Sequence, residues 1–271
     1  MKVDEILAKE KLDKLLHYLR SLGSVAVAFS GGVDSTFLLR AAVEACGTKA
    51  VAVTAQSAVV PARELAEAQE LCKKLGIKQL VYEMDVFTVP GFAENPPDRC
   101  YYCKKALFTK LQELAAEQNA KLVEGSNMDD LGDYRPGLRA LAELEVLSPL
   151  QQAELTKAEI RYLSELWQLP TWSKPSFACL ASRFAYGERI TGDGLAQVER
   201  AEQELLELGF RQFRVRIHGR ELARIEVPAE DIPRLVAVRE TVNAKLKALG
   251  FKYVAVDLAG YRAGSMNEVL K

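Results

Sequence analysis

A junction between an apolar strand and a helix carries the first residues that suit chemistry. The apolar run at 24–29 ends in the hexapeptide SGGVDS at 30–35, and a helical pattern follows. Paired glycines let the backbone turn tightly toward a ligand, and the free N–H groups of a helix start favour an anion. Two serines add hydroxyl donors, whereas Asp34 needs a cation or a donor beside it. A plain strand–helix turn, the simpler alternative, needs neither the aspartate nor the serines.

Three cysteines form a second candidate site. Cys100 and Cys103 make a CxxC pair at an expected loop-to-helix junction, where the helix start and nearby cations favour thiolates. Cys179 also lies among cations, in the segment KPSFACLASR. Three thiolate ligands suit a [4Fe–4S] cluster with one open iron. A redox pair and a zinc site completed by a histidine are the alternatives, although neither His17 nor His218 has a ligand-like spacing.

A third candidate site is a cationic face on the strand expected at 211–218. Arg214, Arg216 and His218 alternate there with apolar residues, so the three cations share one face of the strand. Arginine binds phosphate and carboxylate through two parallel hydrogen bonds, which favours an anionic substrate group here. The alternative is a solvated outer face without a ligand.

The surrounding pattern predicts a parallel α/β domain with helices on both faces of its sheet. Apolar strands alternate with helices, and this arrangement is typical of a sheet buried on both sides. Ligands bind such sheets at the carboxyl ends of the strands, where the hexapeptide and the run starting at Gly125 both fall. Expected strands are 24–29, 49–55, 78–86, 121–126 and 145–150, and expected helices are 35–45, 61–76 and 104–118.

The pattern changes near residue 186, so we expect one domain at 1–186 and a smaller α+β domain at 187–271. The second domain is expected to contribute to substrate binding or oligomerisation. Its expected helices are 192–208 and 229–249, and its expected strands are 211–218, 221–227 and 252–258.

Composition narrows the class of protein. The 271 residues carry a net charge of −1, which argues against general attraction to nucleic acid. We find neither an apolar run long enough for a membrane span nor a signal peptide, so a cytoplasmic enzyme is expected. An odd count of five cysteines argues against a disulfide framework. Cys46 and Cys72 fall in amphipathic helices and are expected to be small buried hydrophobic residues.

The hexapeptide is similar to the signature of the PP-loop ATP pyrophosphatases, and further motifs narrow the resemblance. Together they resemble the LarE-type ATP-dependent sulfur transferases, which build the pincer ligand of the nickel cofactor of lactate racemase. The motifs are SGGVDS, DRCYYCKKALF, EGSNMDD, LSPL, KPSFACLASRF, FRVRIHG and GYRAGSMN, spread over residues 20–267. The resemblance implies that ATP and Mg²⁺ adenylate the carboxylates of pyridinium-3,5-biscarboxylic acid mononucleotide, with release of pyrophosphate, and that sulfur then replaces AMP.

The resemblance also implies roles for residues. Members with one cysteine sacrifice its sulfur, whereas members with cysteines matching Cys100, Cys103 and Cys179 hold a [4Fe–4S] cluster that carries a further sulfide. The chain resembles the second kind, with Cys179 and Asp34 as catalytic residues. Arg214 and Arg216 match the substrate-phosphate arginines. Nucleotide-binding positions would be Ser30, Gly31, Gly32, Asp34, Ser35 and Gly125, and an acidic metal ligand would be Glu226, Asp129 or Asp130.

Partners implied by the resemblance are the mononucleotide, a sulfide donor, other nickel-pincer maturation proteins and further copies of the chain, without nucleic acid or membrane. Two alternatives stay open. Some tRNA thiolation enzymes also combine a PP-loop with three cluster cysteines, although the near-neutral charge and the lack of an added RNA-binding module argue against one here. A non-catalytic nucleotide or metal sensor would have little need for Asp34 together with three thiols.

Overall fold

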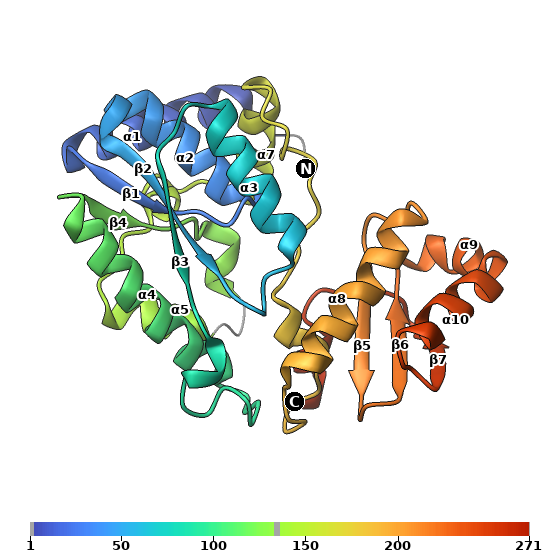
Figure 1. Cartoon of the computed structure of the whole chain (residues 1–271). Coiled ribbons are helices and arrows are strands. Elements are labelled where there is room, and N and C mark those ends of the chain that lie inside the picture. The colour runs from blue at the N-terminus through green and yellow to red at the C-terminus, as the bar shows by residue number, and fades with distance from the viewer. Residues whose placement is uncertain (1–2, 133–135, 271) are drawn as a thin grey trace. The chain divides into compact units, whose positions relative to one another are not determined.

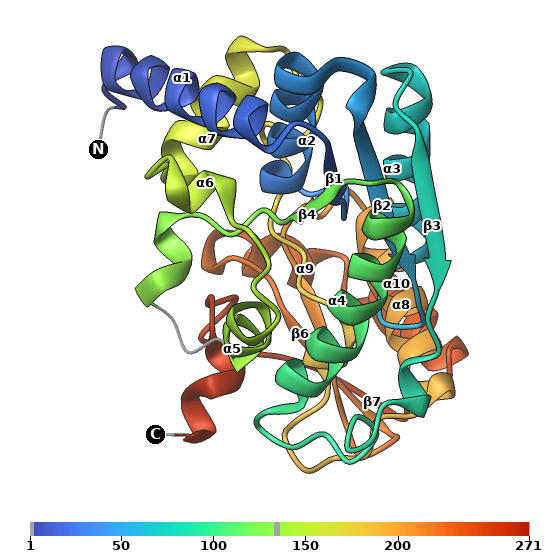
Figure 2. The same cartoon turned by 90° about the vertical axis from the view of Figure 1, so that its left-hand side faces the viewer.

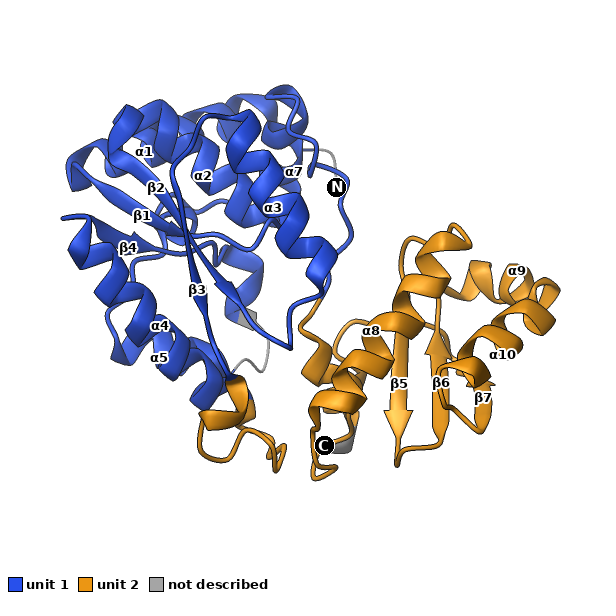
Figure 3. Cartoon of the chain, in the orientation of Figure 1, with its two compact units in different colours: residues 1–85, 100–177 blue, residues 86–99, 178–271 orange. Residues whose placement is uncertain are grey.

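The chain folds into two compact units in the computed structural model, which describes residues 3–132 and 136–270. Unit 1 comprises Met1–Asp85 and Cys100–Phe177, and unit 2 comprises Val86–Arg99 and Ala178–Lys271 (Figure 3). Unit 2 is therefore built from two separate stretches of sequence. The division into domains at 186/187 stays a prediction beside these two units.

Unit 1 is a parallel sheet between helices (Figures 1 and 2). Its strand order is β3-β2-β1-β4, and all three pairings are parallel. Its strands are β1 (Val25–Ala28), β2 (Ala50–Gln56), β3 (Gln79–Glu83) and β4 (Lys121–Val123). Its helices are α1 (Glu5–Leu22), α2 (Val33–Cys46), α3 (Ala62–Lys74), α4 (Arg99–Glu117), α5 (Pro136–Glu143), α6 (Pro149–Gln152) and α7 (Lys157–Leu166).

Alternate residues of β1 supply the two faces of this sheet. Val25 and Val27 join the core formed with α1, α2, α3 and α7, whereas Ala26 joins the core formed with α4 and α5. All three side chains are fully buried. A strand buried on both faces must be apolar throughout, which explains why this run does not alternate with polar residues. The predicted α/β fold of the PP-loop type is confirmed.

The strand expected at 145–150 is wrong. Only Leu147 pairs with the sheet there, through one parallel bridge to Val123, and α6 begins at Pro149. Proline lacks an N–H for a ladder but fits the first turn of a helix. Glu145 has a positive φ of 52°, which also prevents an extended run from forming.

Unit 2 contains a three-stranded sheet of order β5-β6-β7, in which β5–β6 is antiparallel and β6–β7 parallel. The helix expected at 229–249 is two helices separated at Val238. The strands are β5 (Arg214–His218), β6 (Leu222–Glu226) and β7 (Tyr253–Val256), and the helices are α8 (Gly192–Glu207), α9 (Ile232–Ala237) and α10 (Arg239–Ala248). In the part of the chain that is described, no helix is long and apolar enough to cross a bilayer.

Candidate functional site

The turn between β1 and α2 forms the floor of the site in unit 1. Gly31 has a φ of +72°, a conformation that glycine adopts without strain, and a Cβ there would lie 3.2 Å from the Ala68 Cβ. Helix α2 begins directly after Gly32, and this N-cap glycine has no side chain with which to cap the first turn. The helix start therefore keeps N–H groups that an anion can bind.

Two serine hydroxyls brace this turn. The Oγ atoms of Ser30 and Ser35 lie 3.1 Å apart, and the Ser30 N–H donates to the Ser35 Oγ at 3.3 Å. The Ser35 hydroxyl also lies 3.3 Å from the Gly32 carbonyl oxygen. These hydrogen bonds stabilise the conformation of the loop, so its backbone is preorganised before a ligand binds.

Asp34 is the acidic group of the loop, and its two oxygens differ. One oxygen, Oδ2, accepts a hydrogen bond from the Lys157 ammonium at the start of α7. The other, Oδ1, is buried and has no hydrogen-bond partner among the described residues. Such an atom calls for a ligand, and a carboxylate oxygen is what Mg²⁺ prefers. Mg²⁺ commonly uses only one or two carboxylates together with substrate phosphates, so Asp34 fits such an ion.

The end of β4 approaches the same helix start. A Cβ on Gly125 would lie 3.2 Å from the Ser35 nitrogen and 3.4 Å from the Asp34 Cβ, so only glycine allows this approach without a shift. Beyond it, Asp129 accepts a hydrogen bond from the Lys157 N–H at 2.8 Å, and Asp130 accepts one from Asn127 at 2.9 Å. The two predicted segments, 30–35 and 125–130, are thus brought together.

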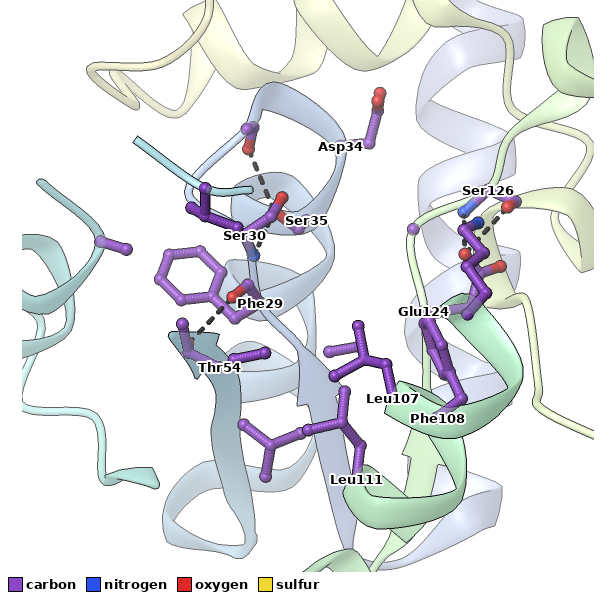
Figure 4. A pocket seen from close by; sticks show the side chains of 18 of the residues that line it. Phe29, Ser30, Asp34, Ser35, Thr54, Leu107, Phe108, Leu111, Glu124 and Ser126 are labelled. Atoms are coloured by element: carbon purple, nitrogen blue, oxygen red, sulfur yellow. Dashed lines mark hydrogen bonds between the residues drawn. The ribbon is translucent and has the colours of Figure 1, made fainter. Parts of the chain in front are cut away.

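A cavity of about 610 Å³ opens over this edge of the sheet. Its polar lining includes Ser30, Asp34, Ser35 and Glu124, and an apolar part is lined by Leu107, Phe108 and Leu111 (Figure 4). A pocket with an anion-binding loop and an apolar wall suits a ligand that joins phosphates to a flat ring.

Comparison with known proteins agrees with this geometry. A family model described as NAD synthase matches residues 7–93, which contain the loop. The pyridinium-3,5-bisthiocarboxylic acid mononucleotide synthase of Lactiplantibacillus plantarum is 39% identical over 258 residues, covering 94% of this chain and 93% of the relative.

The chain belongs to the family of this synthase. An uncharacterised protein of Synechocystis sp. is 41% identical over 266 residues, covering 97% of this chain and 98% of the relative. An uncharacterised protein of Methanocaldococcus jannaschii is 30% identical over 258 residues, covering 94% and 98%. The similarity to the synthase family therefore extends over nearly the whole chain.

The five cysteines fall into two groups in this member of the synthase family. Burial raises the pKa of the Cys72 thiol to about 11, and burial also raises the pKa of Cys46, whose thiol contacts the Leu19 carbonyl oxygen. Cys72 is buried in the core, as expected, whereas Cys46 is only partly buried and packs against the same core. Cys100 and Cys103 are half-buried in the first turns of α4, and Cys179 is exposed just before the 3₁₀ turn Leu180–Arg183.

The structure assembles none of these thiols into a metal centre. Within residues 3–132 and 136–270, no group of three or more His, Cys, Asp or Glu side chains is close enough to hold a metal ion. Cys100 and Cys103 are three residues apart on a helix and so share a face, which leaves both sulfurs on one side of α4. Cys179 belongs to unit 2.

Arg214 and Arg216 are buried, so the alternative of a solvated face is wrong for them. Burial, followed by the charge of Arg183, lowers the pKa of Arg214 to about 10, which still leaves the guanidinium charged at neutral pH. Arg216 forms two hydrogen bonds of 2.9 Å to Glu226. Burial likewise lowers the pKa of the half-buried His218.

Sequence reasoning missed Lys157 and Glu124. Lys157 occupies the first turn of α7, directly after the N-cap Thr156, where a positive charge opposes the helix dipole. A lysine at such an unfavourable position in the sequence could have indicated that Lys157 has an acidic partner nearby. Glu124 is buried and accepts hydrogen bonds from Ser126 and Ser148, and nothing in the sequence distinguishes it from a surface glutamate.

Proposed function

We propose that the chain is an ATP-dependent sulfur transferase that converts the carboxylates of pyridinium-3,5-biscarboxylic acid mononucleotide into thiocarboxylates. The observation that carries this is the loop at 30–35: Asp34 lines the cavity, and its buried oxygen Oδ1 has no hydrogen-bond partner among the described residues. The relative from L. plantarum bears the name of the corresponding bisthiocarboxylic acid synthase.

The proposed reaction has two steps per carboxylate. A carboxylate oxygen attacks the α-phosphorus of ATP, the bond to the β-phosphate bridge breaks, and pyrophosphate leaves. Sulfide then attacks the acyl adenylate, and AMP leaves with the former carboxylate oxygen. The loop binds the phosphates through its N–H groups and serines. Asp34 would hold a Mg²⁺ ion, which would supply positive charge beside the phosphates. Asp129 and Asp130 are further candidates for this ion, because they line the same cavity.

We further propose that Cys100, Cys103 and Cys179 bind a [4Fe–4S] cluster. The donor chemistry fits, because three thiolates leave one iron open, and that iron would carry the sulfide to be transferred. A further contact supports the proposal: Arg99, which directly precedes Cys100, donates to the carbonyl oxygen of Ala181 at 3.1 Å. The residue before the CxxC pair is thus bonded to a residue two positions after Cys179.

Arg214 and Arg216 are proposed to bind the substrate phosphate. Both guanidiniums are charged and buried on one strand, where an arriving phosphate would be little screened by water. Glu226 already pairs with Arg216, so a phosphate would compete with this carboxylate or draw on the remaining N–H groups. A sulfide donor, the other nickel-pincer maturation proteins, a cytoplasmic setting and homo-oligomerisation complete the proposal.

One experiment tests the core of this function. The protein, purified without oxygen and analysed for iron and sulfide, is incubated with ATP, Mg²⁺, sulfide and the mononucleotide. AMP, pyrophosphate and a product heavier by the exchange of oxygen for sulfur are expected by mass spectrometry. Formation of ADP and phosphate would contradict the proposal. Formation of the thiocarboxylate product by protein without bound iron would retain the adenylation step and refute the cluster.

A further inference from the structure

The segment that carries Cys179 is held by its main-chain carbonyl groups. Arg183 Nη1 donates to the carbonyl oxygens of Ala178 at 2.9 Å and Cys179 at 3.3 Å. Arg99 donates to Ala181 at 3.1 Å, and Arg216 donates to Ser182 at 2.6 Å. Three arginines from three places in the chain thus converge on a stretch of five residues.

Asn95 is a further side chain that donates to a main-chain carbonyl group of this segment. The Asn95 amide donates to the Ala185 carbonyl oxygen at 2.6 Å, and its own oxygen accepts a hydrogen bond from Arg99. Its side chain is fully buried, as is that of Arg183. The Cys179 side chain is exposed. The exposed thiol of Cys179 therefore belongs to a main-chain segment whose carbonyl groups accept hydrogen bonds from buried side chains.

Glu202 of α8 orients the central arginine. Its two oxygens accept from Arg183 Nε at 2.7 Å and Nη2 at 2.9 Å, and both side chains are inaccessible to solvent. Glu202 also accepts the Val215 N–H of β5 at 3.0 Å. With two nitrogens fixed by the carboxylate, the third is directed at the Ala178 and Cys179 carbonyls. Lysine cannot bind the carboxylate and the two carbonyl groups in this way, because it lacks the planar array of N–H donors of a guanidinium group.

Stability alone does not explain why the ion pair of Arg183 and Glu202 is buried. Burying a guanidinium–carboxylate pair is often no more stabilising than packing apolar side chains of the same volume. Reactions between bound groups, in contrast, lose rate steeply when an attacking atom is misplaced by about 1 Å. A short 3₁₀ turn has little intrinsic rigidity with which to hold an exposed thiol.

We infer that the Arg183–Glu202 pair is a positioning device that fixes the main chain of residues 178–182, through the Ala178 and Cys179 carbonyl groups and the Ser182 hydroxyl, and with it the Cys179 sulfur, for sulfur transfer. This rests on the proposed function, in that Cys179 must handle sulfur, either as a cluster ligand or as a donor. Arg183 and Glu202 act through the backbone and touch no reacting atom.

The test compares Arg183→Lys and Glu202→Gln with the control Glu204→Gln, which removes a charge from the same helix where Glu204 pairs with Lys245. Hydrogen exchange of the full-length protein is followed by mass spectrometry, without substrate. Amides in 178–182, including that of Ser182 bonded to the Cys179 carbonyl, are expected to exchange at least tenfold faster in both variants. The control should match the wild type.

Activity provides the second measurement. Sulfur transfer should slow at least tenfold in Arg183→Lys, while the KM for ATP and the release of pyrophosphate stay within twofold of the wild type. Unchanged exchange in 178–182, or an equal rise throughout α8 and β5, would overturn the inference, as would faster exchange with normal sulfur transfer. If Glu202→Gln does not fold, Arg183→Lys decides. A wild type that releases no pyrophosphate refutes the proposed function instead, and the exchange pattern still shows whether the pair holds the segment.

Discussion

Asp34 combines a paired and an unpaired oxygen in one carboxylate, and this difference makes its role testable. Lys157 binds one oxygen, and the other is buried without a partner among the described residues. The ion pair is partly exposed, at 30% for Lys157 and 25% for Asp34, so it contributes at most about 1 kcal/mol to stability. A change at Asp34 should therefore affect catalysis far more than folding.

Replacing Asp34 with asparagine keeps the size of the side chain and removes its charge. ATP-dependent pyrophosphate release is expected to fall about a hundredfold, because one metal-binding charge is lost where charge develops in the transition state. The melting temperature should change little. Glu44→Gln, on the same helix and paired with Arg40 one turn earlier at 2.9 Å, is the matched control. Release of pyrophosphate at the wild-type rate would assign Asp34 to the ion pair alone.

The thiol of Cys72 should be unreactive at neutral pH. With a pKa of about 11, only about one in a thousand Cys72 thiols is ionised at pH 8. Because both pH 8 and pH 9 lie well below this pKa, the thiolate fraction rises about tenfold between them. The rate of alkylation of Cys72 should rise by the same factor. Peptide mapping after iodoacetamide treatment measures both rates, with the exposed Cys179 as reference. Equal labelling of Cys72 and Cys179 in the folded protein would contradict the burial.

Arg214 allows a test of the substrate-phosphate proposal. Arg214→Lys keeps the positive charge and loses the bidentate contact with a phosphate. This loss costs about 1.5–3 kcal/mol, or roughly ten- to a hundredfold in affinity for the mononucleotide. The KM for the mononucleotide should rise by that factor, and the KM for ATP should not. Arg211→Lys, at an exposed position three residues earlier, is the control. Equal KM values for the mononucleotide in Arg214→Lys and wild type would return Arg214 to a packing role.

At the scale of elements, the site depends on how closely β4 approaches α2. Gly125 makes that approach possible, because a Cβ there meets the backbone of the helix start. Gly125→Ala should displace the first turn of α2 by a few tenths of an ångström and raise the KM for ATP severalfold. Gly192→Ala, whose Cβ would meet nothing closer than 3.9 Å, is the control and should leave KM unchanged. An unaltered KM in Gly125→Ala would show that the loop absorbs the shift.

Sequence patterns predicted the parallel sheet well, because buried strands and amphipathic helices leave strong periodic signals. They failed at 145–150, where local backbone constraints at Glu145 and Pro149 outweigh an apolar composition. The turn at 30–35 was predictable as a candidate site because glycine, serine and aspartate have few other reasons to cluster there. Glu202 and Arg183 were not, since a buried ion pair leaves no local trace and forms only through tertiary contact.

At the scale of the whole molecule, the three thiols separate two mechanisms. If Cys100, Cys103 and Cys179 bind one cluster, each single change to alanine should abolish both iron loading and sulfur transfer. If Cys179 is sacrificed, only its change should abolish transfer, and the spent chain should be lighter by one hydrogen sulfide. Mass spectrometry after turnover measures this difference. Activity retained in Cys100→Ala together with that mass loss would overturn the cluster.

Unit 2 takes residues 86–99 from the first half of the chain and the rest from 178 onward. On the ribosome, the early stretch therefore emerges about 80 residues before its partners exist. At roughly 5–20 residues per second, this interval lasts about 4–16 s. During that time Asn95 and Arg99 have no carbonyl groups of 181–185 to bind, whereas most of unit 1 can already collapse around its sheet. Nascent chains stalled before residue 178 should accordingly be cut by protease within 86–99, and full-length chains should resist.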